Sequence, residues 1–240
     1  MKKFVSMLLV VVMLLTLAAC GKSNSGSEKQ EEEKKLVVYS PNSENMINLL
    51  IPMFEKETGI KVELISAGTG ELIKRLQSEK DNPYADVLFG GSKAQTLNYP
   101  ELFEKYVSKN DEYMLEGHKN VDGFLTPYVA DGSVLLVNTD LAGDIEINGY
   151  KDLLNPKLKG KIIGADPLSS SSAFAHLTNM LLAMGGYESD EAWDYVKQLI
   201  TNMEGKVASG SQAVHKSVAD GEYVVGLTYE DPAASYLLDG

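Results

Sequence analysis

Small hydroxyl residues gather at four places in the sequence, each between an apolar run and a helical pattern. These places are residues 40–43, 66–70, 169–172 and 209–211. The first turn of a helix leaves backbone N–H groups without intrahelical partners, and the helix dipole adds positive potential there. Serine hydroxyls beside such amides favour a carboxylate, phosphate or phosphonate. The pattern therefore predicts an anion-binding site, whereas a single serine at each place would be explained as a helix N-cap.

The elements around these turns alternate between strand and helix. The clearest case begins at residues 162–165, an apolar run that predicts a buried strand. Asp166 and Pro167 end the run, four serines follow, and a helical pattern starts near Ala173. Strands alternating with helices predict a parallel α/β sheet covered by helices. Because the turns that follow parallel strands emerge at one edge of a sheet, we expect the hydroxyl-rich turns to converge.

The N-terminus has the pattern of a targeting segment. Lys2 and Lys3 precede an apolar run over residues 4–15, and Leu-Ala-Ala at 17–19 precedes Cys20. This pattern resembles the lipobox of bacterial lipoproteins, which implies a signal peptide over residues 1–19 and lipidation of Cys20. Residues 20–35 are predicted to be the lipidated cysteine and a flexible tether. We therefore expect a lipid anchor on the outer face of a membrane.

Charge and cysteine content exclude several classes of function. The formal net charge of −12 argues against nucleic acid as a partner. The single cysteine, Cys20, excludes an intrachain disulfide framework and a cysteine-rich metal site. Position 73 is isoleucine where a dinucleotide-binding fingerprint starting at Gly68 needs its third glycine, so no nucleotide cofactor is expected.

Seven short segments carry a family resemblance. They are LVVYS (36–40), FEKETGIKV (54–62), GTGEL (68–72), ADVLFGG (85–91), LKGK (158–161), ADP (165–167) and GLTYE (226–230). Together they resemble the extracellular solute-binding proteins of ABC importers, in the branch for ferric iron, aminoethylphosphonate and hexose phosphates. The resemblance implies a type II periplasmic-binding-protein fold: α/β, with two lobes, mixed but mostly parallel sheets, a hinge, and solute held between the lobes. It also implies permease and ATPase subunits as partners.

The resemblance divides the chain and suggests its binding residues. We expect a first lobe over residues 36–130, a hinge or crossover over 131–138 and a second lobe over 139–240. Ferric relatives place two adjacent tyrosines near the end of the second lobe, whereas here Tyr229 is followed by Glu230. Phosphate-type relatives use serines at helix starts together with a histidine and a glutamate. The candidate ligand-binding residues are Ser40, Thr69, Gly70, Ser170, Ser171, Ser172, Ser211, His215, Tyr229 and Glu230.

Alternatives remain at this point. His215 is as readily a surface residue, and Tyr229 a core residue, as either is a solute contact; Trp193 is expected in the core. A phosphorylated or phosphonate solute is favoured, and a ferric-iron or other metal receptor is the alternative. A lipid-anchored hydrolase using a serine, His215 and a carboxylate is the third hypothesis. The chain has no Gly-x-Ser-x-Gly or His-Glu-x-x-His motif, so we expect it not to be an enzyme.

The length of the sequence departs from the family pattern. Chains of this branch run roughly a third longer, with a return segment that completes the first lobe and crosses the hinge a second time. The sequence stops at Gly240, so we expect a C-terminal truncation in which the second crossing is missing. A first lobe without its last elements would expose apolar surface, which predicts poor stability for the chain as printed.

Overall fold

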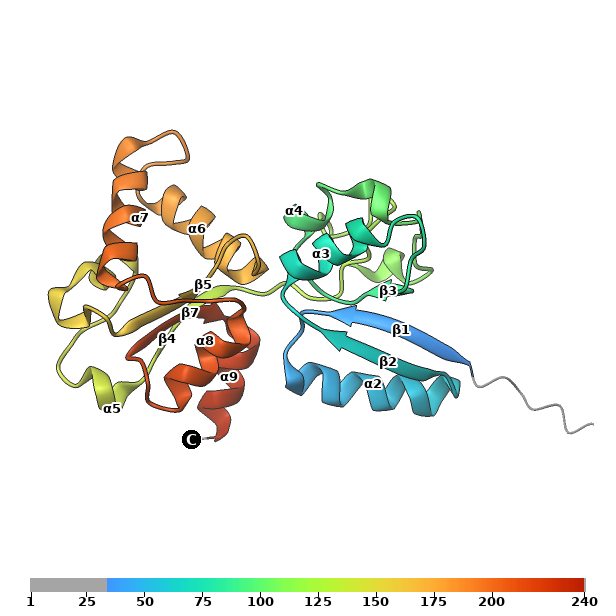
Figure 1. The fold of residues 1–240 in the computed structure, drawn as a ribbon, viewed down its shortest axis with the longest axis horizontal. Coiled ribbons are helices and arrows are strands. Elements are labelled where there is room, and N and C mark those ends of the chain that lie inside the picture. The colour runs from blue at the N-terminus through green and yellow to red at the C-terminus, as the bar shows by residue number, and fades with distance from the viewer. Residues whose placement is uncertain (1–33, 240) are drawn as a thin grey trace, which may run out of the picture. The chain divides into compact units, whose positions relative to one another are not determined.

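The first of two β-sheets is built from the N-terminal part of the chain. The computed structural model describes residues 34–239, so the predicted signal peptide and Cys20 lie outside the described residues. β1 (Lys35–Ser40) lies between β2 (Lys61–Ser66) and β3 (Val87–Leu88), and both pairings are parallel (Figure 1). The helices α2 (Glu44–Thr58) and α3 (Thr69–Ser78) follow β1 and β2. The strand–turn–helix rhythm predicted for this part is confirmed.

The ends of α2 follow from local chemistry. Ser43 is the N-cap and its hydroxyl accepts a hydrogen bond from the Met46 N–H. Gly59 ends the helix with φ 71°, and its N–H donates to the Glu55 carbonyl oxygen. This left-handed conformation is the one that glycine adopts without steric cost, as the Thr-Gly pair in the sequence predicts.

A long connection then joins the two sheets. It contains α4 (Lys93–Thr96) and the 3₁₀ turns η1 (Pro100–Leu102) and η2 (Asp111–Tyr113). The end of this connection leads into the second sheet, whose strand β4 begins at Ser133. Tyr128 packs its ring against Phe89 with centroids 5.1 Å apart, and its hydroxyl donates to Asn42. These contacts hold the segment beside the first sheet without strand pairing.

The second sheet is mixed. Its order is β4 (Ser133–Val137), β7 (Val225–Tyr229), β5 (Ile162–Ala165) and β6 (Val207–Ala208). β4 runs antiparallel to β7, whereas β5 is parallel to both β7 and β6. The predicted fold class, α/β with mixed and mostly parallel sheets, is confirmed. Residue 133 belongs to this sheet, so the predicted crossover over residues 131–138 overlaps the strand β4.

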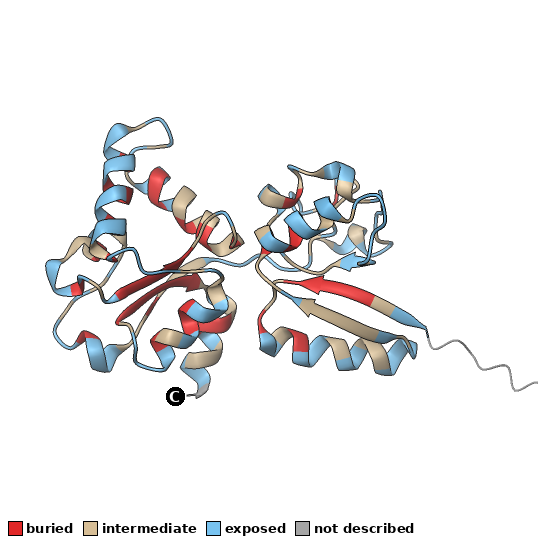
Figure 2. Ribbon diagram, viewed as in Figure 1, coloured by how far each residue is buried: buried red, intermediate tan, exposed pale blue. Residues whose placement is uncertain are grey.

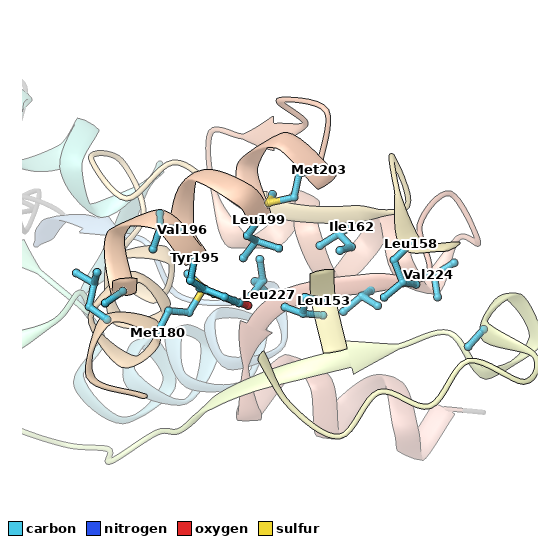
Figure 3. Packing of buried hydrophobic residues seen from close by; sticks show 14 residues of the cluster. Leu153, Leu158, Ile162, Met180, Tyr195, Val196, Leu199, Met203, Val224 and Leu227 are labelled. Atoms are coloured by element: carbon cyan, nitrogen blue, oxygen red, sulfur yellow. The ribbon is translucent and has the colours of Figure 1, made fainter. Parts of the chain in front are cut away.

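Helices pack on both faces of the second sheet and bury its two central strands, β5 and β7 (Figures 1 and 2). They are α5 (Thr139–Ala142), η3 (Tyr150–Leu154), η4 (Pro156–Leu158), α6 (Ser171–Ala183), α7 (Asp190–Asn202), α8 (Ser211–Ala219) and α9 (Glu230–Asp239). The larger core cluster includes Leu153, Leu158, Ile162 and Leu199, all with at most 2% of their surface exposed (Figure 3). Within residues 34–239 no helix has the length and hydrophobicity that crossing a bilayer requires.

Two single residues illustrate how helix phase decides burial. Trp193 was expected in the core but is 42% exposed, and its indole N–H donates to the Tyr187 carbonyl oxygen. It lies one position beyond Ala192 on α7, outside the stripe that Val196 and other residues bury. His176 on α6, in contrast, is 2% exposed, and its ring nitrogens contact the Thr228 carbonyl oxygen and the Tyr150 hydroxyl.

An aromatic and ionic cluster fastens α3 to the first sheet. The Arg75 guanidinium lies 4.8 Å from the centroid of the buried Tyr39 ring and 5.8 Å from that of Tyr84. Its Nε also donates to Glu79 at 2.8 Å, and the Tyr39 hydroxyl donates to the same carboxylate. Arg75 therefore combines cation–π contact with an ion pair over a buried ring.

We expect Arg75→Ala to lower the free energy of unfolding measurably, because it removes both contacts and leaves Glu79 without its cationic partner. Urea denaturation measures the change. Lys74→Ala, at the exposed neighbouring position of the same helix, is the control and should change stability by only a few tenths of a kcal/mol. Equal effects of the two substitutions would contradict the role assigned to the cluster.

Candidate functional site

Three of the hydroxyl-rich turns meet the end of β1 at one cleft of about 470 Å³. The turn after β2 leads into α3, the turn after β5 into α6, and the turn after β6 into α8. The lining is dominated by small polar residues and backbone. It consists of Ser40, Pro41, Asn42, Ser66, Ala67, Gly68, Thr69, Glu71, Ser170, Ser171, Ser209, Gly210, Ser211, Gln212, Ala213 and Lys216.

Two of the helix N-termini in the cleft carry no side-chain cap. The N-cap of α8 is Gly210 and that of α3 is Gly68, and at neither helix start does a capping side chain accept a hydrogen bond from the backbone N–H groups. At α6 the Ser170 hydroxyl accepts from the Ala173 N–H. The first residues of α8, Ser211 and Gln212, line the cleft. Uncapped amides at a helix start, with hydroxyls beside them, are suited to an anion.

Hydrogen bonds join the turns across the cleft. The Gly70 N–H donates to the Ser169 carbonyl oxygen at 3.0 Å, and the Thr69 hydroxyl donates to the Ser171 hydroxyl at 3.2 Å. The Ser169 hydroxyl donates to the Ser209 carbonyl oxygen at 2.6 Å. The turn at residues 169–172 thus contacts both of its neighbours, and the three helix starts are held together.

A second compartment of about 300 Å³ adjoins the first and shares four lining residues with it. The shared residues are Pro41, Asn42, Ser171 and Ser211. Unlike the first compartment, it also contains two tyrosines; its other lining residues comprise Gly91, Ser92, Lys93, Tyr128, Val129, Asp131, Gly132, Ser133, Ser172, Ala175 and Tyr229.

Burial shifts the pKa values of two tyrosines and one carboxyl group in the second compartment toward the neutral forms. Burial raises the pKa of the Tyr229 phenol well above its usual value, and the nearby Asp231 adds to the effect. Burial likewise raises the pKa of Tyr128 and of the Asp131 carboxyl. A neutral phenol is a hydrogen-bonding group and a poor ligand for a hard metal ion. Across residues 34–239 no group of three or more His, Cys, Asp or Glu is placed to hold a metal ion.

Most of the serine and threonine candidates line the cleft, but several of their hydroxyls have partners. Ser171, Ser172 and Ser211 are half-buried lining residues. Ser170 is buried and shares a hydrogen bond of 3.1 Å with Ser172. Ser40 is fully buried, donates to the Phe89 carbonyl oxygen at 2.6 Å and accepts from the Asn42 N–H.

Gly70 and Thr69 mainly join the turns. Gly70, a candidate ligand-binding residue, donates its backbone N–H to the Ser169 carbonyl oxygen, so that amide is already occupied. Thr69 lines the larger compartment but is 1% exposed, and its hydroxyl donates to Ser171. Tyr229 lines the second compartment.

His215 and Glu230, two of the predicted solute contacts, are not among the lining residues of either compartment. His215 lies on the buried face of α8 with Val214 and Val218, and its Nδ1 lies 3.2 Å from the Thr228 hydroxyl. Burial lowers the pKa of His215 to about 4, so the ring is neutral at physiological pH. Glu230 is exposed, and its N–H donates to the Gly132 carbonyl oxygen.

Several lining residues were missed by reasoning from the sequence, among them Asn42, Tyr128 and Asp131. Asn42 lies within the turn at residues 40–43, which the sequence had already indicated as part of the anion-binding site. Tyr128 and Asp131 belong to the connection between the sheets, and only the packing of Tyr128 against Phe89 and Asn42 brings them to the site. No local pattern marks that packing.

Two α/β lobes with an anion-suited cleft between them define the class: this is the type II periplasmic-binding-protein fold. The chain belongs to the family of bacterial extracellular solute-binding proteins, whose model matches residues 50–237. Among solved structures, the periplasmic binding protein AfuA from Actinobacillus pleuropneumoniae, with fructose 6-phosphate bound, superposes with a TM-score of 0.76 at 29% identity, covering 87% of this chain and 67% of that one. The family and fold predicted from the sequence are confirmed.

Curated relatives are similar in sequence but differ in their ligands. Iron uptake protein A1 of Synechocystis is 30% identical over 209 residues, covering 82% of this chain and 57% of the relative. A Salmonella typhimurium protein, whose name gives 2-aminoethylphosphonate as its proposed ligand, is 26% identical over 156 residues, covering 65% of this chain and 44% of the relative. The chain spans a little over half the length of the first relatives it matches.

Proposed function

We propose that this chain is the solute-capturing part of a lipid-anchored receptor of an ABC importer, and that the captured solute is a small phosphate ester or phosphonate. The observation that carries the proposal is the convergence of the α3, α6 and α8 N-termini at one cleft of about 470 Å³, two of them without side-chain caps. Lipidation of Cys20, the importer partners and the outer membrane face belong to the same proposal.

The local electrostatics outweigh the acidity of the whole chain. The formal net charge is −12, but an anion in the cleft is governed by the groups within a few ångströms. Helix starts supply positive potential there without an ionised side chain. Lys216 on α8 lines the same compartment, but its ammonium group is paired with the Asp220 carboxylate, and Glu71 is the acidic lining residue. We place the phosphoryl oxygens nearest the uncapped start of α8, away from Glu71.

The division of the cleft suggests how the rest of the solute is recognised. The larger compartment presents helix starts, and the adjoining one presents neutral tyrosines, Asn42 and Asp131. Phenol and amide groups both donate and accept hydrogen bonds, which suits hydroxyl or amine groups. A solute with an anionic head and a short polar body matches both compartments, and it would contact the shared residues Asn42, Ser171 and Ser211 where they join.

Ferric iron is the second candidate, because Tyr128, Tyr229 and Asp131 lie in one compartment and one relative is an iron uptake protein. Iron binding through these residues would require ionised phenols. The raised pKa of both tyrosines opposes that ionisation, so we rank iron below a phosphorylated solute.

Isothermal titration calorimetry with inorganic phosphate, 2-aminoethylphosphonate, fructose 6-phosphate, fructose and ferric citrate tests the proposal. We expect at least one phosphorus compound to bind with micromolar affinity or better, and fructose not to bind, because only the former carries the anion. Visible absorption should stay flat on addition of ferric citrate. A coloured ferric complex, with no heat from any phosphorus compound, would favour the iron receptor instead.

A further inference from the structure

Two glycines at the start of α3 lie against the backbone of the second lobe. A Cβ atom added to Gly70 would lie 2.0 Å from the Leu168 carbonyl oxygen, and one added to Gly68 would lie 2.6 Å from the Ser169 carbonyl oxygen. Neither distance is compatible with van der Waals contact. The opposing atoms are backbone, which cannot move aside as a flexible side chain can. The start of α3 can therefore lie this close to the turn at residues 168–169 only because neither glycine has a side chain.

The same glycines are not needed for local backbone conformation. Gly68, the N-cap of α3, has φ −64° and ψ 150°, values that serine readily adopts. Gly70 lies inside α3, where alanine is favoured over glycine by about 0.5 to 1 kcal/mol. The local backbone would therefore favour other residues at both positions. The contact across the cleft is the remaining physical explanation for the two glycines.

The close approach is also hydrogen-bonded. The Gly70 N–H donates to the Ser169 carbonyl oxygen at 3.0 Å, and Thr69 donates to Ser171 at 3.2 Å. Ser169 also contacts the turn that precedes α8, because its hydroxyl donates to the Ser209 carbonyl oxygen. A separation of the lobes on the order of 1 Å, as a Cβ would impose, is enough to break bonds of this length.

We propose that Gly68, Gly70 and the turn at residues 168–169 form a glycine latch that holds the two lobes in the solute-binding arrangement. In this role Gly70 and Ser169 are positioning residues: they hold the starts of α3 and α8 at one cleft but do not themselves bind the solute. The latch is a property of the chain alone, whereas its effect on affinity rests on the proposed function. When a smaller fraction of the protein is in the binding-competent state, the apparent affinity for the ligand falls by the same factor.

Distance measurements between two spin labels test the latch without any solute. The labels are placed at Lys74→Cys on α3 and Glu188→Cys ahead of α7, both exposed, in the full chain carrying Cys20→Ser. Gly70→Ala is expected to lengthen or broaden the distance distribution while preserving or raising the helical signal in circular dichroism. Gly149→Ala is the control, because Gly149 has extended backbone and open space at its Cβ, and it should match the parent.

A second variant, Gly68→Ser, keeps the test valid if Gly70→Ala fails to fold. Gly68→Ser introduces a good N-cap for α3 and the same steric block, so it should open the lobes as Gly70→Ala does. Unchanged distance distributions in both variants would overturn the latch. Opening of the control to the same extent would overturn it equally, because the effect would then not depend on the contact.

Binding of inorganic phosphate separates the two proposals. If the parent binds phosphate, Gly70→Ala should weaken it about tenfold or more and Gly149→Ala should not. Equal affinity in the opened variant would overturn the positioning role. If the parent binds none of the phosphorus compounds but Gly70→Ala still opens the lobes, the latch stands and the proposed solute class fails.

Discussion

Replacing Ser171 with aspartate is expected to abolish binding of phosphorus compounds while leaving the fold intact. Ser171 is the first residue of α6 and lines both compartments of the cleft. A carboxylate at this position would bring a negative charge next to the bound anion. Two like charges about 4 Å apart repel by about 4 kcal/mol near a protein surface, which corresponds to a loss of affinity of more than about a hundredfold.

The fold should tolerate the same substitution because acidic residues are favoured in the first turn of a helix. Ser189→Asp is the matched control: Ser189 caps α7, its hydroxyl accepts from the Ala192 N–H, and it is not a lining residue of the cleft. Both variants add one negative charge to the chain. If calorimetry found the same affinity in both, the anion would not bind in the part of the cleft that Ser171 lines.

Acid should destabilise the second lobe through its buried histidines. Burial lowers the pKa of His215 from 6.5 to about 4, and it also lowers the pKa of His176. The unfolded chain therefore binds more protons than the folded one in this range, so stability is complete above about pH 6.5 and falls as the pH drops toward 4. For His215 the loss is about 2 kcal/mol at pH 5.

His215→Gln separates this effect from the carboxylates that also titrate in acid. Glutamine keeps an amide to pair with the Thr228 hydroxyl and has no ionisable group. Urea denaturation between pH 7 and pH 4.5 should give a shallower loss of stability for the variant than for the parent. Parallel pH profiles would contradict the lowered pKa. Phosphate affinity at pH 7 should change little, because His215 lines neither compartment.

The fold was largely predictable because its signals are local. The apolar run at residues 162–165 became β5. Ser170 caps the start of α6 and Gly59 ends α2, as their residue types favour. The convergence of the turns also followed, since strands β1, β2 and β3 are parallel and so are β5, β6 and β7.

The site was less predictable because it depends on helix phase and on packing between distant segments. His215 was expected at the solute, yet Val214 and Val218 on the same helix are buried against the second sheet and carry His215 with them. The apolar spacing of these two valines contained that information. Asp131 was missed for a different reason: its place follows from the contact of Tyr128 with Asn42, 86 residues away in the chain.

The way the chain passes between the sheets restricts where it can twist. Within residues 34–239 it crosses once, and Tyr128 is fastened on the near side by its bond to Asn42. On the far side Ser133 is in register with Tyr229, and Gly132 accepts from the Glu230 N–H. Any swivel of one lobe on the other must therefore be absorbed by the backbone torsions of residues 129–131, a pivot three residues long that ends at the second compartment of the cleft.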